Sequence, residues 1–171
     1  MLEIKTAEEL IDPELEARRA ARRHGPQADV LREILLAFAD RGGPIPVDAI
    51  TAGLSGRSPV AAREALTTLD EEDLVQVREG HVEIAYPFSA VPTPFVARLA
   101  EGQERYACCA IDALGMAPML GERVQIRSRC YDCGDALELA VSPDGPAPEA
   151  GGLMLWVGRR EAGQRRIATS L

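Results

Sequence analysis

Two adjacent thiols and a carboxylate stand close together in the apolar segment from Tyr106 to Leu120, which reads YACCAIDALGMAPML. Cys109 and Asp112 are three residues apart, so in a helix their side chains share one face at about 5 to 6 Å. A cysteine in the first turn of a helix lies near the partial positive charge of unpaired N–H groups, which favours the reactive thiolate. The spacing therefore predicts a helix whose opening turn brings a thiolate and an acid to one reacting atom.

A purely structural role for the same residues stays open. Free cysteine is among the most buried residue types, and an apolar helix is an ordinary place for it. A carboxylate within an apolar run is costly unless it is paired or used. Asp112 could also be a helix-start residue that satisfies backbone donors. The spacing alone is compatible with both chemistry and packing.

The other two cysteines, Cys130 and Cys133, belong to a Cys-Tyr-Asp-Cys-Gly segment with the spacing of half a zinc site. A complete zinc site needs two more ligands, and only Cys108, Cys109, two distant histidines and carboxylates remain to supply them. Three interpretations stay open: a structural zinc site, a thiol site for mercury or copper, and simple turn cysteines. The candidate metal ligands are thus Cys109 and, beside it, Cys108, Cys130 and Cys133.

The charge of the chain limits its partners. A formal net charge of −8 and a pI near 4.9 argue against general attraction to nucleic acid or an anionic membrane, so small molecules or proteins are expected. The N-terminus lacks the apolar core of a signal peptide, and no run of about 18 apolar residues occurs, which predicts a cytoplasmic protein. There the cysteines are expected as reduced thiols, metal ligands or catalysts. No nucleotide-binding glycine loop or serine triad is visible.

The elements that must position these residues begin with helices. Residues 1–26 form a charged leading region, with a solvated helix expected at 13–23 that ends at His24-Gly25-Pro26. From Gln27 to Asp40, apolar residues recur at the i, i+3, i+4 spacing of an amphipathic helix that Gly42-Gly43 stops. This second helix is expected to hold a small core together.

Residues 27–86 have the layout of a winged helix-turn-helix. A short helix at 47–54 meets a turn, Ser58 caps a second helix with Pro59 at its first position, and strands at 74–77 and 81–84 form the wing. Between Val47 and Val77, six acidic residues stand against two arginines, which would repel phosphate. We therefore expect packing, or contact with a second copy in a homodimer, rather than DNA binding. His81 on the wing is expected to have no chemical duty.

A proline-rich linker at 87–94, whose residues are not expected in a central strand, separates this module from a second domain at 95–171. The cysteine helix of that domain should close near Gly121. The lone Trp156 is expected to line the core or a pocket, and the Arg159–Arg166 tail to be a solvated end rather than a nucleic-acid patch. The fold class is α+β, a winged helical module followed by a mixed sheet-and-helix domain, with strands expected at 95–99, 105–107, 124–129, 137–142 and 153–157.

Four segments together resemble the alkylmercury (organomercurial) lyase family over about residues 28–157. They are PFSAVPTPF, YACCAIDAL, APMLGERVQIRSRC and CGDALELAVSP. The most specific part is the Cys-Ala-Ile-Asp tetrad with Tyr before it and Leu after it. The resemblance implies a lyase-like second domain and an enzyme that cleaves carbon–mercury bonds.

The resemblance also implies residue roles. Cys109 would be the metal-binding thiolate and Asp112 the proton shuttle, while Cys130 matches a cysteine thought structural in the family. The family's second catalytic cysteine would lie near or beyond Leu171, and no cysteine follows Cys133, so the chain is either truncated or altered at its site. The expected partner is a small organometallic substrate or a soft metal ion, with a small-molecule thiol and no required cofactor. The alternative is a non-catalytic thiol-based metal-binding or sensing protein with the lyase fold.

Overall fold

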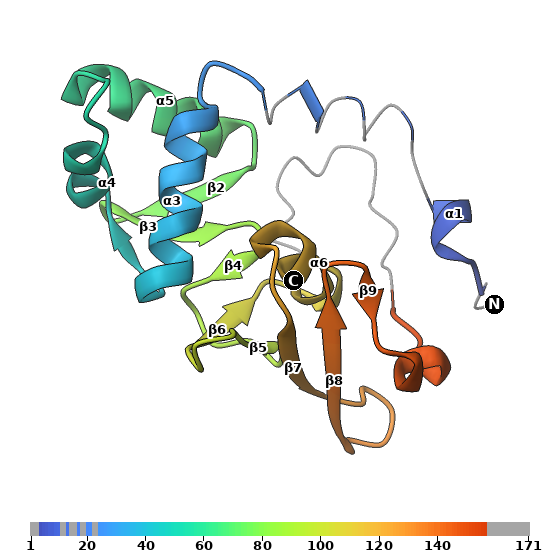
Figure 1. Cartoon of the computed structure of the whole chain (residues 1–171). Helices are drawn as coiled ribbons and strands as arrows, with labels where there is room; N and C mark the ends of the chain where they lie inside the picture. The colour runs from blue at the N-terminus through green and yellow to red at the C-terminus, as the bar shows by residue number, and fades with distance from the viewer. Residues whose placement is uncertain (1–3, 11–12, 14–16, 18–19, 22–23, 157–171) are drawn as a thin grey trace.

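The structure is a computed structural model that describes residues 4–10, 13, 17, 20–21 and 24–156. Near its N-terminus the short helix α1 (Ala7–Leu10) is set away from the rest of the fold (Figure 1). The leading helix expected at 13–23 falls mostly outside the described residues. Within the described ranges, no helix is both long and apolar enough to cross a membrane.

Three helices gather at one end of the molecule: α3 (Ala28–Arg41), α4 (Val47–Gly53) and α5 (Pro59–Glu71) (Figure 1). The apolar spacing in α3 buries one face of that helix, as expected, including Ile34 and Phe38. The start of α5 is also as predicted, because the Ser58 hydroxyl accepts a hydrogen bond from the Ala61 N–H at 3.2 Å. These helix predictions are confirmed.

All strand pairs are antiparallel and join in one sheet. The order is β1-β3-β4-β6-β5-β7-β8-β9, and β2 pairs with β3 off this path. The helical end carries β1 to β3, and the remaining strands extend the sheet below it (Figure 1). The strands are β1 (Ile45–Pro46), β2 (Val75–Arg78), β3 (His81–Ala85), β4 (Phe88–Ser89), β5 (Val96–Arg98), β6 (Glu104–Ala107), β7 (Val124–Arg129), β8 (Ala136–Ser142) and β9 (Gly145–Pro146).

The expectation that the proline-rich segment stays out of the central sheet is wrong. Strand β4 lies inside it and pairs with β3 through Ala85 and Phe88, and with β6 through Phe88 and Ala107. The physical reason is that Pro87 and Pro92 flank the strand, so Phe88 and Ser89 keep both backbone hydrogen-bonding groups. This two-residue strand thus connects the helical end to the rest of the sheet.

Helix α6 (Ala110–Leu120) packs against β5 to β9 and ends at Gly121, whose φ of 70° is the left-handed cap expected there. A strand at 153–157 is not formed in its described part. Instead, β9 pairs with the edge of β8, a 3₁₀ turn η1 (Pro148–Gly152) follows, and the chain then runs without strand pairing to residue 156. Trp156 is 66% exposed, so its expected place in a core or pocket is wrong.

One buried apolar cluster includes residues from the N-terminal helices and from strands as late as β8. At its middle the rings of Phe38 on α3 and Phe88 on β4 stack with centroids 5.8 Å apart and planes 7° from parallel. The fold is α+β, with helices on an antiparallel sheet. The boundaries proposed for separate domains stay a prediction.

Candidate active site

The chain that leads into the cysteine pair is held by hydrogen bonds from two neighbouring segments. The Cys108 N–H donates to the Pro87 carbonyl at 3.0 Å, and the Thr93 hydroxyl donates to the Ala107 carbonyl at 2.6 Å. The Phe95 N–H in turn donates to the Thr93 hydroxyl at 3.2 Å. The sequence reading missed this role of Thr93, although a threonine between two prolines is typical of a side-chain-stabilised turn.

The two cysteines do not lie in the first turn of the helix, and that part of the prediction is wrong. Helix α6 starts at Ala110, and Cys109 is its N-cap in an extended conformation with φ −149° and ψ −179°. Cys108 still belongs to the extended chain that follows β6, where its N–H is bonded to the Pro87 carbonyl. The Cys109 carbonyl then accepts the first helical hydrogen bond, from the Ala113 N–H at 3.0 Å.

Cys109 and Asp112 nevertheless meet, as their spacing predicted. Both side chains are half-buried, and that of Asp112 is hydrogen-bonded to the Cys109 thiol. The pKa of Cys109 is raised from an ordinary 9.0 to about 11, mainly because burial penalises the thiolate and also because of this hydrogen bond. The N–H groups of Asp112 and Ile111 lower the pKa of Cys109, but by less.

The expected thiolate is therefore wrong for the free protein: at neutral pH the Cys109 thiol keeps its proton. The field of the helix start acts in the predicted direction, but burial and the neighbouring carboxylate outweigh it. The arrangement is a protonated thiol beside an acid. When an electrophile binds the Cys109 sulfur, the thiol loses its proton. The Asp112 carboxylate can take up that proton.

Cys108 has a different environment from its neighbour. Its side chain is only 4% exposed, and the thiol donates a hydrogen bond to the Phe88 carbonyl at 3.2 Å. Burial raises the pKa of Cys108 far above the ordinary range, and the charges of Asp112 and Cys109 add to this effect. The thiol is thus engaged with β4 as a neutral donor, and its role as a metal ligand stays a prediction.

Cys130 and Cys133 come together in the turn between β7 and β8. Their side chains are close enough for each to shift the pKa of the other. The N–H groups of Cys133 and Asp132, with the Cys133 side chain, lower the pKa of Cys130. For Cys133, the Asp135 N–H lowers the pKa, but the Asp135 side chain and Cys130 raise it more. No group of three or more His, Cys, Asp or Glu side chains that could hold a metal occurs among the described residues.

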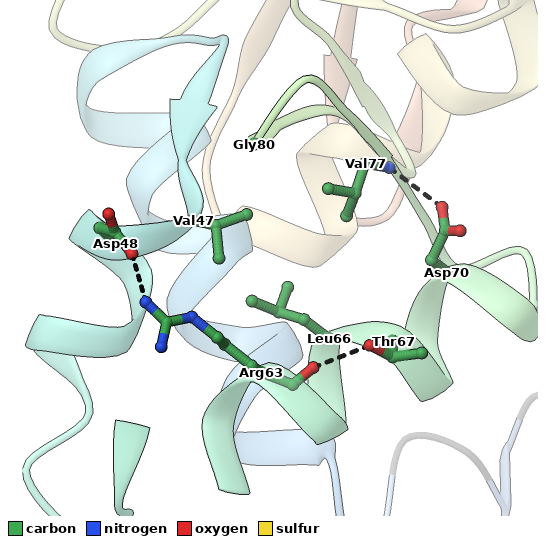
Figure 2. Close-up of a pocket in the computed structure, with 8 residues that line it drawn as sticks. All are labelled: Val47, Asp48, Arg63, Leu66, Thr67, Asp70, Val77 and Gly80. Atoms are coloured by element: carbon green, nitrogen blue, oxygen red, sulfur yellow. Dashed lines mark hydrogen bonds and ion pairs between the residues drawn. The ribbon is translucent and has the colours of Figure 1, made fainter. Parts of the chain in front are cut away.

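A separate groove of about 430 Å³ lies in the helical end of the molecule (Figure 2). Arg63 Nη2 bonds Asp48 Oδ1 at 2.7 Å on one side of it, and Asp70 accepts from the Val77 N–H at 3.0 Å on the other. No pattern in the sequence indicates this groove, and none of its lining residues belongs to α6. They come from α4, α5 and the β2–β3 hairpin: Val47, Asp48, Arg63, Leu66, Thr67, Asp70, Val77 and Gly80.

Comparisons with known proteins agree on one family. The family model "MerB: Alkylmercury lyase" matches residues 88–171, and so starts later than the expected residue 28. The alkylmercury lyase of Staphylococcus epidermidis is 34% identical over 110 residues, which are 64% of this chain and 49% of that protein. The alkylmercury lyase of Streptomyces lividans is 31% identical with the same coverage. The chain thus spans about half the length of these curated relatives.

The fold agrees with a solved member. The crystal structure of the mercury-bound form of MerB2 aligns with a TM-score of 0.60 and 25% identity, over 71% of this chain and 58% of that one. The matched segment includes Cys108, Cys109, Asp112, Cys130 and Cys133. Residues 88–171 of this chain thus match the alkylmercury lyase family in sequence, and the fold agrees with that of a mercury-bound MerB2.

Proposed function

We propose that this protein is an organomercurial lyase-like enzyme, which breaks a carbon–mercury bond by thiol-assisted protonolysis and releases Hg(II) and a hydrocarbon. The observation that carries the proposal is the contact between the Cys109 thiol and the Asp112 side chain, inside the segment that matches the alkylmercury lyase family. Cys109 is the mercury ligand and Asp112 the proton carrier.

The proposed step begins when an organomercury cation replaces the proton on the Cys109 sulfur. The Asp112 carboxylate, already hydrogen-bonded to that thiol, takes the displaced proton. Thiolate donation to mercury weakens the bond to carbon, since soft sulfur ligands suit soft metals. When this bond breaks, its electron pair stays with carbon, and carbon takes the proton from the Asp112 carboxyl group. The hydrocarbon leaves, and Hg(II) remains on sulfur.

A second sulfur donor completes the proposal. We assign this role to a small-molecule thiol in excess, which also removes Hg(II) from Cys109. No resident metal or organic cofactor is part of the proposed reaction. Mercury enters only as part of the substrate.

The test uses the full chain, a simple alkyl- or arylmercury compound and excess small thiol, with released hydrocarbon measured by gas chromatography. Cys109→Ser should abolish release, and Asp112→Asn should bind the substrate through Cys109 but fail to protonate carbon. Asp144→Asn is the matched control, because this carboxylate is exposed in the β8–β9 turn. Undiminished release by Cys109→Ser would overturn the proposal.

The same assay tests the alternative, a non-catalytic thiol-based metal-binding or sensing protein. That function predicts stoichiometric uptake of a soft ion by the unmodified chain without release of hydrocarbon. Release by the unmodified chain at a rate above that of thiol alone would exclude it.

We further infer that the helical end is a winged helix-like module that serves packing or dimer contact rather than DNA binding. Supporting this, α4, a turn and α5 are followed by the β2–β3 hairpin, and both arginines near α5 are already paired. Arg57 Nε lies 2.7 Å from Asp29 Oδ2, and Arg63 Nη2 lies 2.7 Å from Asp48 Oδ1. Fluorescence anisotropy with labelled duplex DNA at physiological salt should show no binding, and a steep salt-dependent affinity would contradict this inference.

A further inference from the structure

The turn between β7 and β8 holds two thiols in a defined backbone loop. The Cys130 N–H donates to the Asp135 carbonyl at 2.8 Å, and the Gly134 N–H donates to the Cys130 carbonyl at 3.0 Å. Gly134 has φ 75°, a left-handed conformation that glycine adopts without strain. The loop joins β7 and β8, which pair through six residues of each strand. Backbone hydrogen bonds therefore set the relative positions of the two cysteines.

Within this loop the two free thiols stand three residues apart on either side of a tight turn, near enough to shift each other's pKa, and Cys133 is exposed to solvent. The N–H groups of Asp132 and Cys133 are directed at the Cys130 sulfur, where they would also stabilise a thiolate bound to a cation. The pair is thus accessible, preorganised and supplied with donors to sulfur. A dithiol of this kind is suited to a cation that needs few ligands.

The number of ligands selects the ion. Zinc in structural sites is almost always held by four ligands. Among the described residues no third His, Cys, Asp or Glu joins this pair to make a metal-binding group. A soft cation that accepts two thiolates fits the loop better, and Hg(II) is such an ion. The proposed reaction also releases it.

We propose that Cys130 and Cys133 form a second metal site, separate from Cys109, that binds Hg(II) through two thiolates. The proposal rests on the proposed function only for the identity of the ion. Hg(II) arrives bound to two small thiolates, and each protein thiol passes its proton to the thiolate that it displaces. Two small thiols leave, two protein sulfur–mercury bonds form, and nothing is oxidised or reduced.

Binding at this site can be followed by tryptophan fluorescence. Tyr131 lies between the two cysteines, and its ring is 6.4 Å from that of Trp156, the only tryptophan of the chain. A heavy ion bound at the turn should quench the fluorescence of this tryptophan. Quenching reports on the turn and not on hydrocarbon release, so it distinguishes this proposal from the enzymatic one.

The experiment titrates inorganic Hg(II) into a Cys109→Ser chain, which lacks the proposed catalytic thiol. A short linker gives the second thiol an effective concentration of about millimolar or more, so the pair should retain one Hg(II) against about 0.1 mM monothiol. Native mass spectrometry measures retention, and Trp156 emission measures quenching. Adding Cys130→Ser or Cys133→Ser should weaken retention by at least about tenfold and remove the quenching.

Ser128→Ala on β7 is the matched control, because it removes a hydroxyl group near the turn and no thiol. It should keep both retention and quenching in the Cys109→Ser background. Equal retention with and without Cys133, or no retention by the Cys109→Ser chain, would overturn the second site. Neither result bears on hydrocarbon release from an organomercury substrate, whose failure would count against the proposed function alone.

Discussion

Arg105 Nη2 on β6 donates a hydrogen bond to the Ala39 carbonyl of α3 at 2.7 Å. The same guanidinium also donates to the carbonyls of Phe38 and Asp40 at 2.7 and 2.6 Å. These carbonyls belong to the last turn of α3, where carbonyls run out of helical N–H partners, and that of Phe38 also accepts from the Gly42 N–H at 2.9 Å. A side chain from the middle of the sheet therefore caps α3, the longest helix that the structure describes in full.

Arg105→Ala should lower the free energy of unfolding by about 1–3 kcal/mol, because several half-buried carbonyls lose a charged donor. Urea unfolding followed by circular dichroism measures the change. Arg98→Ala on neighbouring β5 is the control, since that side chain is exposed, and it should change stability by about 0.5 kcal/mol or less. A similar loss in both variants would contradict the capping role.

Asp112→Asn should speed the alkylation of Cys109 by iodoacetamide at pH 8. The Asp112 side chain helps to raise the pKa of this thiol to about 11, so removing its charge lowers the pKa. Each unit by which the pKa falls gives about tenfold more thiolate. Peptide mass spectrometry can follow Cys109 separately from the other cysteines. With Asp144→Asn as control, an unchanged pH–rate profile in Asp112→Asn would show that the two side chains do not interact in solution.

Protein stability should fall as pH rises above about 9. The pKa of Cys109 is about 11 in the folded protein against an ordinary 9.0, so the unfolded chain loses this proton first and binds fewer protons. The contribution is fully present below the unfolded pKa and is lost as pH rises through the folded one. Urea midpoints at pH 8, 9.5 and 10.5 measure the decline, and Cys109→Ser should reduce its slope. An identical slope in that variant would place the effect elsewhere.

Gly43→Ala should destabilise the joint between α3 and β4. A methyl group there would fall against the Phe38 ring and lie 2.7 Å from the Ala90 Cβ, so one of these neighbours must move. Overpacking of this kind costs about 1–3 kcal/mol in the free energy of unfolding. Gly56→Ala is the matched control, because no atom lies within 4 Å of its added methyl group. Thermal unfolding of the two variants should differ clearly, and equal melting temperatures would count against the tight contact.

Much of the fold could be predicted because local signals agreed with the final packing. Three features depend only on neighbouring residues in the sequence. They are the Ser58-Pro59 start of α5, the apolar spacing in α3 and the Gly121 end of α6. Strand β4 could not be read in this way. Its two residues become a strand only because β3 and β6, distant in sequence, lie on either side of it.

The site shows the same division between local and distant effects. The contact of Cys109 with Asp112 follows from a three-residue spacing at a helix start, so the sequence could predict it. The protonation of the thiol could not be predicted, because burial depends on how α6 packs against the sheet. The exposure of Trp156 could not be predicted for a related reason: aromatic residues favour cores, and nothing local shows that this one lies at the surface.

The position of β4 also bears on whether the segment that matches the family model could fold as a separate fragment. The matching region begins at residue 88, the first residue of a strand whose one neighbour, β3, lies before that boundary. A fragment cut there would open the backbone edge of β4 and uncover the face of Phe88 that stacks on Phe38. The start of the family model's match at residue 88 is therefore not a boundary of autonomous folding, because Phe88 pairs with β3 and stacks on Phe38, both of which lie before it.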